Sequence, residues 1–242
     1  DDYVVNGSKT WTSYAQHANM MFALVRTSTE GKVQQGISFL LIEMDSPGIS
    51  VTPIINLEGV HEFNQVFFDD VRVPKSQRVG EENDGWSVAK YLLEFERFSM
   101  SSVELRRVLG KIEALAKLTT VDGRTLVADA QFQRSINQLK IDAMALEASE
   151  QRVLANLSAG KRPGAVSSVL NTRSAETLQR ADQLGVEVAA YYGLPYQPEA
   201  LAVGSLEPPI GPPGAITMMP SYLSNRMRTI AGGSSEIQRN II

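Results

Sequence analysis

The chain has 242 residues, a formal net charge of −4 and 43% hydrophobic residues, values that are typical of a soluble globular protein and argue against non-specific nucleic-acid binding. It contains no cysteine, which excludes disulfides, zinc–thiolate sites and a cysteine nucleophile, and its two histidines, His17 and His61, show no metal-ligand spacing. No apolar run reaches the length of a membrane span, and we expect no metal site. Because Asp1 reads as the middle of a strand, we expect the chain to be part of something longer.

Residues 1–78 carry short strand patterns separated by turn signals. The stretch YVVNGSKTW places Asn6-Gly7, a strong hairpin signal, between two short runs. Further strands are expected in MMFALVRT, GISFLLIEM, ISVTPI and NQVFFDDVRVP, the last of which ends at Pro74. This regular spacing of short strands and turns predicts a β-barrel or sandwich segment.

Residues 79–242 carry helical patterns instead. No proline occurs from Trp86 to Leu118, and further long helical patterns cover residues 130–159 and 165–192. A loop rich in proline and glycine follows, before SYLSNRMRTI returns to helix. Strands first and helices after predict an α+β protein, with a β domain over 1–78 and a helical bundle over 79–242.

The helix expected to begin at Trp86 places one carboxyl group on an apolar stripe. Steps of three and four residues along this stripe give Trp86, Ala89, Leu93, Glu96, Met100 and Val103. Burial would raise the pKa of Glu96 towards neutrality, which suits a general base, whereas a buried glutamate satisfied by a hydrogen-bond partner would be purely structural. Glu94, by contrast, lies on a charged face beside Lys90 and Arg97 and is interpreted as structural.

The closing stretch TIAGGSSEIQRNII places Gly232-Gly233-Ser234-Ser235 immediately before a helix. Glycine has no Cβ atom, so two in succession allow the backbone to approach a ligand closely. We therefore interpret this turn as a place where backbone amides meet something bound.

Four stretches, in this order, resemble the acyl-CoA dehydrogenases, FAD enzymes that introduce an α,β double bond into acyl-CoA thioesters. They are NGSKTWTSYAQHANMMFALVRT, FDDVRVP followed by VGEENDGW, LEFERF, and GGSSEIQRNII. The resemblance implies the middle β domain and the C-terminal four-helix bundle of that family. The family's N-terminal helical domain and the first part of its β domain have no counterpart in this sequence.

The resemblance implies contacts with FAD at two places. Trp11 matches the tryptophan that packs beside the isoalloxazine, with Thr12 next to it, and Ser13 matches a hydroxyl residue near flavin N5. Ser234, Ser235 and Glu236 resemble the flavin contacts at the start of the last helix. Three of these residues have a structural alternative: Trp11 as a core residue, Ser13 as an ordinary strand residue, and Glu236 as a first-turn acid favoured by the helix dipole.

The resemblance also implies roles towards the substrate. Many members carry the catalytic glutamate in the closing motif, where this chain has Gly232, whereas a subset supplies it from the earlier helix, at the position of Glu96. The backbone N–H of Gly232 would face the thioester carbonyl oxygen, and Gly233 would allow close approach. Arg97 matches an arginine near the CoA portion, with an ion pair to Glu94 as its structural alternative.

The implied function is dehydrogenation of an acyl-CoA: Glu96 removes the α-proton, hydride passes to flavin N5, and an electron-transfer flavoprotein accepts the electrons. The implied assembly is a homo- or hetero-oligomer, a dimer or tetramer, in the bacterial cytoplasm or the mitochondrial matrix. The family's RxxFG segment reads DGRTLVADAQF here. That departure keeps a non-catalytic or half-site partner subunit of a heteromeric dehydrogenase open as an alternative, beside an acyl-CoA oxidase-like flavoenzyme.

Overall fold

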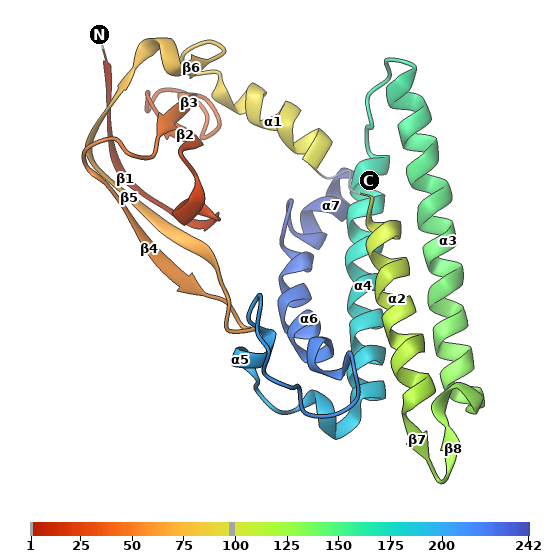
Figure 1. Ribbon diagram of the computed structural model, residues 1–242. Helices are drawn as coiled ribbons and strands as arrows, with labels where there is room; N and C mark the ends of the chain where they lie inside the picture. Colours follow the sequence, from red (N-terminus) through yellow and green to blue (C-terminus); the bar gives the residue numbers. More distant parts are fainter. Residues whose placement is uncertain (1, 97–99) are drawn as a thin grey trace. The chain divides into compact units, whose positions relative to one another are not determined.

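A computed structural model describes residues 2–96 and 100–242, so Arg97 lies outside the described residues. The chain divides into two compact units, Asp1–Leu93 and Glu94–Ile242 (Figure 1). The first is built of strands and the second mostly of helices, which confirms the expected α+β class with a β segment before a helical one. The domain boundary expected at residues 78/79 stays a prediction.

The N-terminal unit consists of two antiparallel three-stranded sheets. One has the strand order β1 (Asp2–Ser13), β5 (His61–Pro74), β4 (Ile49–Ile55), and the other has β2 (Met20–Arg26), β3 (Ile37–Glu43), β6 (Arg78–Val79). Their shared apolar core comprises Val5, Ala15, Ala23, Leu40, Ile42, Val66, Phe68, Val71 and Val73. In β5 alternate side chains are buried, which explains why this polar–apolar sequence folds as a strand with one face inwards.

Asn6-Gly7 does not form the expected hairpin. β1 runs straight through both residues and pairs with β5, and the register shifts between Val5 and Gly7. The Asn6 side chain donates from Nδ2 to Asp70 Oδ1 at 2.9 Å and accepts at Oδ1 from the Asp70 N–H at 2.9 Å. The same glycine that suits a tight turn also suits a β-bulge, and pairing with a distant strand decided between the two.

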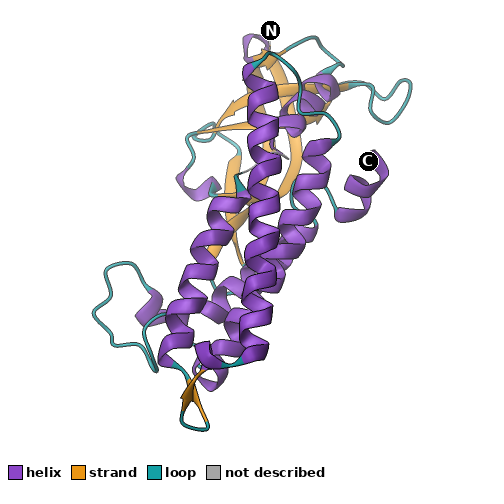
Figure 2. Ribbon diagram, turned by 90° about the vertical axis from the view of Figure 1, so that its right-hand side faces the viewer, coloured by secondary structure: helices purple, strands orange, loops and turns teal. Residues whose placement is uncertain are grey.

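The C-terminal unit is organised around three long helices. α2 (Ser101–Leu118), α3 (Ala130–Ser158) and α4 (Val166–Ala189) lie side by side, with α3 antiparallel to the other two, and α6 (Met218–Ser224) packs on α4 (Figures 1 and 2). The core between them includes Leu105, Ile112, Leu115, Ile136, Leu139, Leu178, Ala181 and Val188. The shorter elements are β7 (Thr120–Val121), β8 (Arg124–Thr125), α5 (Pro198–Leu201) and α7 (Ser235–Ile241).

The helices expected over residues 130–159 and 165–192 form as α3 and α4, with nearly the expected bounds. α3 begins after Asp129, whose side chain accepts a hydrogen bond from the Phe132 N–H at 2.8 Å, the usual way to satisfy a free amide at a helix start. The single helix expected from Trp86 to Leu118 is instead two: α1 covers Gly85–Glu96 and α2 begins at Ser101, after a non-helical Met100. Within the described residues, no helix is long and apolar enough to cross a membrane.

Candidate functional site

Trp11 lies in a strained, exposed segment of β1. Its φ is +61°, and the pairing of β1 with β5 shifts register between Lys9 and Thr12. A bulky residue with positive φ is an outlier that persists only where surrounding contacts hold it. The indole is 63% exposed and meets Phe63 edge-on, with ring centroids 6.0 Å apart. Trp11 is therefore not a core residue but a fixed aromatic surface.

The buried side-chain amide of Asn64 holds this segment in place. Asn64 is fully buried and donates from Nδ2 to the Thr12 carbonyl oxygen at 3.1 Å and to Gln16 Oε1 at 2.6 Å. Its Oδ1 lies 2.7 Å from His61 Nε2, and Gln16 Nε2 donates to the His61 carbonyl oxygen at 3.2 Å. Every hydrogen-bonding group of the Asn64 side chain therefore has a partner, which makes the Thr12 backbone position well determined.

The residues after Trp11 are arranged so that their side chains remain accessible. Thr12 is half-buried and Ser13 is exposed. Tyr14 also has positive φ, +54°, and its N–H donates to the Glu62 carbonyl oxygen at 2.8 Å. Trp11, Thr12 and Ser13 thus form one short, backbone-fixed strip at the end of β1.

The diglycine turn lies in the C-terminal unit, directly before α7. Gly232 and Gly233 have φ of +69° and +103°, a region that favours glycine. A Cβ atom on Gly232 would stand 3.2 Å from Asn171 Nδ2 of α4. The carbonyl oxygens of both glycines accept hydrogen bonds from Gln238 Nε2, at 2.9 and 3.1 Å. Both the conformation and the space available therefore call for glycine at 232.

The start of α7 explains two of the candidate flavin residues structurally. The Ser234 hydroxyl caps the helix and accepts from the Ile237 N–H at 3.4 Å, while Ser235 is buried. The backbone N–H of Glu236 and the Ser234 hydroxyl lower the pKa of the exposed Glu236 carboxyl group. The carboxyl group therefore has the surroundings of a first-turn acid, and its contact with FAD stays a prediction.

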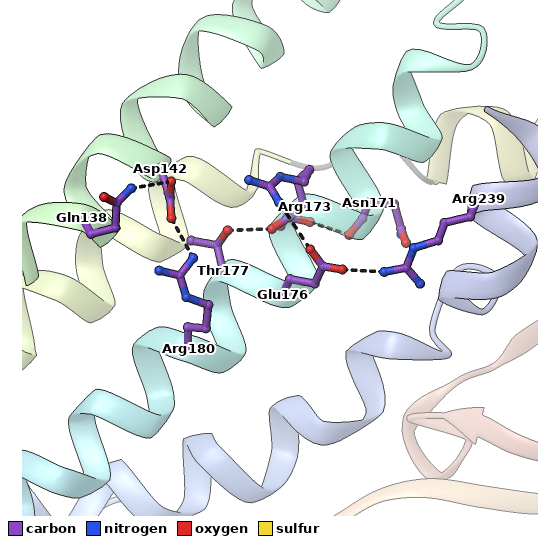
Figure 3. A network of polar contacts seen from close by, with 9 residues as sticks. Gln138, Asp142, Asn171, Arg173, Glu176, Thr177, Arg180 and Arg239 are labelled. Carbon is purple, nitrogen blue, oxygen red and sulfur yellow. Dashed lines mark hydrogen bonds and ion pairs between the residues drawn. The ribbon is translucent and has the colours of Figure 1, made fainter. Parts of the chain in front are cut away.

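Ion pairs hold α7 against α4. Arg239 Nη2 lies 2.6 Å from Glu176 Oε1, and Arg173 Nη1 lies 3.5 Å from Glu176 Oε2 (Figure 3). The network continues along α4 to Arg180, which donates to Asp142 Oδ2 of α3 at 2.8 Å. These pairs are half-exposed, so they orient the helices more than they stabilise them.

A second, more buried network holds the segment that leads into the diglycine turn. Arg228 donates to both Glu104 oxygens at 2.7 and 2.8 Å, which connects this segment to α2. Asn225 accepts from Arg228 Nε at 2.7 Å and donates to Asp182 Oδ2 at 2.7 Å. Burial is the largest influence on Asp182 and raises the pKa of its carboxyl group.

Glu96 is not buried, which corrects the interpretation from the apolar stripe. It is the last residue of α1 and is exposed, as are Met100 and Val103 of the same stripe. The stripe argument required one continuous helix, and α1 ends at Glu96. Glu94 is half-buried and lies 3.6 Å from Arg162 Nη1, so its structural interpretation gains a partner that the helix pattern could not indicate.

The structure thus brings together two groups of candidate residues, each within its own compact unit. Trp11, Thr12 and Ser13 form the first, and Gly232, Gly233, Ser234, Ser235 and Glu236 form the second. Sequence patterns missed Asn64 and Gln238, the buried carboxamides that hold these groups, because nothing local marks an amide as buried. No group of three or more histidines, aspartates or glutamates suited to a metal ion occurs among the described residues.

Comparisons with known proteins agree across both units. A family model for the acyl-CoA dehydrogenase middle domain matches residues 1–71, and one for the acyl-CoA dehydrogenase C-terminal domain matches residues 83–242. The acyl-CoA dehydrogenase IpdE1 of Mycobacterium tuberculosis is 34% identical over 244 residues, covering 100% of this chain and 58% of the relative's length.

Solved structures share the fold. The ChsE4–ChsE5 complex from Mycobacterium tuberculosis matches 100% of this chain and 60% of that chain, with 30% identity and a TM-score of 0.80. A glutaryl-coenzyme A dehydrogenase in complex with glutaryl-CoA matches with a TM-score of 0.83 at 20% identity, over 100% of this chain and 58% of the other, which shows the fold alone. The chain spans less than two thirds of each of these relatives. With both domain models and IpdE1 matched, the chain belongs to the acyl-CoA dehydrogenase family.

Proposed function

We propose that the complete protein oxidises an acyl-CoA thioester to its α,β-unsaturated product with FAD. The observation that carries the proposal is the pairing of glutamate at 96 with glycine at 232, within a chain whose two units both match the family. The family places its base at one or the other of these positions. Glycine at 232 cannot take a proton, whereas Glu96 can.

In this proposal Glu96 removes the α-proton of the thioester. Its place at the end of α1, rather than in the middle of a buried helix face, leaves the carboxyl group accessible to a ligand. A carboxylate held within hydrogen-bond reach of the proton it abstracts contributes typically about 10²- to 10⁴-fold to the rate. The role rests on residue type and position, not on burial.

The diglycine turn would stabilise the charge that develops as the proton leaves. Removal of an α-proton places negative charge on the thioester oxygen, and a backbone N–H at that point lowers the barrier. We assign this role to the backbone of Gly232, with Gly233 allowing close approach. Loss of one such donor typically costs about 10²- to 10³-fold in rate. Arg97 is proposed to contact the CoA portion.

The residues present fit a flavin. Trp11 offers an exposed indole fixed by strained backbone, and the neighbouring Thr12 and Ser13 are small and carry hydroxyl groups. Ser234, Ser235 and Glu236 are proposed to contact FAD from the start of α7. When bound, FAD supplies the hydride acceptor for the β-hydrogen. The protein's own contribution is a fixed aromatic surface in the N-terminal unit and a fixed glycine turn in the C-terminal unit.

Partners follow from the same proposal. We propose an electron-transfer flavoprotein as electron acceptor, an assembly of two or four subunits, and a bacterial cytoplasmic or mitochondrial matrix location.

The test is the visible spectrum of the purified full-length protein, recorded anaerobically with a panel of acyl-CoA thioesters. A yellow protein that bleaches with one thioester supports the proposal and identifies the substrate class. An oxidase would also bleach, and rapid recolouring on admission of oxygen separates it from a dehydrogenase.

Glu96→Gln keeps the side-chain volume but cannot accept the proton, so flavin content should be unchanged while the rate of bleaching falls by about 10²-fold or more. Glu94→Gln is the matched control, because it removes a carboxylate two residues away that pairs with Arg162; its bleaching rate should stay within a few-fold of the unaltered protein. If Glu96→Gln bleaches at the unaltered rate, the base is another residue.

A partner subunit is the second candidate function. Two observations favour it: the family's RxxFG segment reads DGRTLVADAQF here, and a 30% identical structural relative is a complex of two differently named chains. A colourless protein that gains flavin only when co-expressed with a second dehydrogenase subunit would support this candidate over the first.

A further inference from the structure

The turn at Gly232-Gly233 is held by a side chain that no sequence pattern singled out. Gln238, on the first turns of α7, is fully buried, and its Nε2 donates to the carbonyl oxygens of both glycines. We propose that Gln238 is the positioning residue of the diglycine turn: it fixes the two peptide units on the C-terminal side of Gly232, and with them the backbone position from which the Gly232 N–H would face the substrate carbonyl. This inference rests on the proposed function for its catalytic consequence, but not for its structural one.

The orientation of the Gln238 amide follows from its partners. Two carbonyl oxygens can only accept hydrogen bonds, so the NH₂ group must face them and Oε1 must face away. Oε1 is buried and has no hydrogen-bond partner among the described residues. Burying an unpartnered carbonyl is costly, so an apolar residue would fill this space at lower cost if packing were the only requirement. The side chain is therefore placed for its two donors.

These donors determine which way the turn's amides point. In a trans peptide unit the N–H is directed opposite to the C=O of the same unit. Because the carbonyl groups of Gly232 and Gly233 point at Gln238, the N–H groups of Gly233 and Ser234 point away from it. Two adjacent glycines have more accessible backbone conformations than any other pair, so the turn needs an external contact to select one of them.

Neighbouring contacts fix α7, and with it the position of Gln238. Arg239, the next residue, pairs with Glu176 of α4 at 2.6 Å (Figure 3). Asn171, one turn earlier on α4, lies where a side chain on Gly232 would otherwise extend. Gln238 is therefore held in place by a docked helix, and the turn that it contacts lies against α4 on its other side. Its two hydrogen bonds prevent the peptide units of the turn from rotating.

Gln238→Met tests the inference in the full-length protein, because it keeps the length of the side chain and removes both donors. Amide hydrogen exchange should become at least about tenfold faster at positions 231 and 238, whose backbone N–H groups bond to the carbonyl oxygens of Met227 and Ser234 on either side of the turn. In the same variant, flavin content and acyl-CoA affinity should stay within a few-fold of the unaltered protein. The anaerobic rate of flavin reduction should fall by about 10- to 100-fold, as expected when a reacting group is slightly misplaced.

Gln179→Met is the matched control. Gln179 Nε2 donates to the Asn225 carbonyl oxygen at 2.9 Å, so this variant removes a comparable bridge to backbone without touching the glycines. Its exchange at 231–238 and its reduction rate should both match the unaltered protein. Gln238→Glu is the second variant if Gln238→Met does not fold, because it keeps the shape of the side chain, and its carboxylate form offers no donor to either carbonyl oxygen.

The outcomes separate the two proposals. Faster exchange together with slower reduction supports the inference, whereas unchanged exchange or an unchanged reduction rate overturns it. If the unaltered protein is bleached by no acyl-CoA while Gln238→Met still exchanges faster, then Gln238 holds the turn, the positioning role towards a substrate is overturned, and the proposed function fails on its own test.

Discussion

Two buried carboxamides, Asn64 in the N-terminal unit and Gln238 in the C-terminal unit, each donate to backbone carbonyl groups beside candidate site residues. Backbone that approaches a ligand has to be held in one position from the protein side. A side-chain amide does this with directional hydrogen bonds at low cost when its partners are satisfied.

Asn64→Ala should lower the free energy of unfolding of the protein by about 1–3 kcal/mol, because it removes a fully buried amide and leaves partly buried groups of Thr12, Gln16 and His61 without their partner. Asn6→Ala is the comparison, since Asn6 makes a similar number of contacts with the exposed Asp70 and should cost less. Urea unfolding measures both values. Equal losses for the two variants would contradict the special weight given to Asn64.

Asp182 predicts a pH dependence of stability. Burial raises the pKa of its carboxyl group, Glu104 adds to that rise, and the Asn225 amide, Arg226 and Arg228 oppose it. A carboxyl group whose pKa is raised in the native state stabilises the fold in its protonated form. This contribution is fully present below the unfolded pKa of about 3.9 and is lost as pH rises through the native pKa. Asp182→Asn does not titrate, so its stability relative to the unaltered protein should increase with pH above about 3.9 and then level off. Urea unfolding across this pH range checks the sign, and a pH-independent difference would contradict it.

At the scale of elements, the start of α1 depends on close approach to β3. A Cβ atom on Gly85 would stand 2.5 Å from the backbone of Ser38 and Phe39. Backbone cannot move aside as a flexible side chain can, so this first residue of the helix has to be glycine. Gly110, in the exposed face of α2, meets nothing within 4 Å and has no such requirement.

Opposite effects are therefore expected from the same substitution in two helices. Gly85→Ala should destabilise the protein by about 1–3 kcal/mol through overpacking. Gly110→Ala should stabilise it by about 0.5–1 kcal/mol, because alanine loses less backbone entropy in a helix. Thermal unfolding of both variants decides the matter, and a gain in melting temperature for Gly85→Ala would show that the contact with β3 gives way.

For the whole molecule, features that depend on local pattern could be predicted and those that depend on distant contacts could not. The helices over 130–158 and 166–189 follow from periodicity and a local cap at Asp129. Asn6-Gly7 suited both a hairpin and a bulge, and only pairing with β5 distinguishes them. The candidate residues at 11–13 and 232–236 were found through resemblance, whereas Asn64 and Gln238 required the tertiary structure.

The expected burial of Glu96 failed for the same reason, because it depended on where a helix ends. A helical face is a property of a continuous helix, and the calculation of a stripe fails wherever the helix ends. The residue that looked buried on the pattern is the last of α1 and is exposed. Its assignment as the base now depends on position within the family and on the glycine at 232.

The start of α2 is covered by a neighbour and not by its own sequence. Met100 offers no side-chain cap, and the buried Glu150 of α3 instead accepts hydrogen bonds from the N–H and the hydroxyl of Ser102, the N–H at 3.1 Å. A change at position 102 or 150 alone would leave a polar group buried without its partner, so we expect these two positions to vary together and a joint replacement by apolar residues to cost less than either single change.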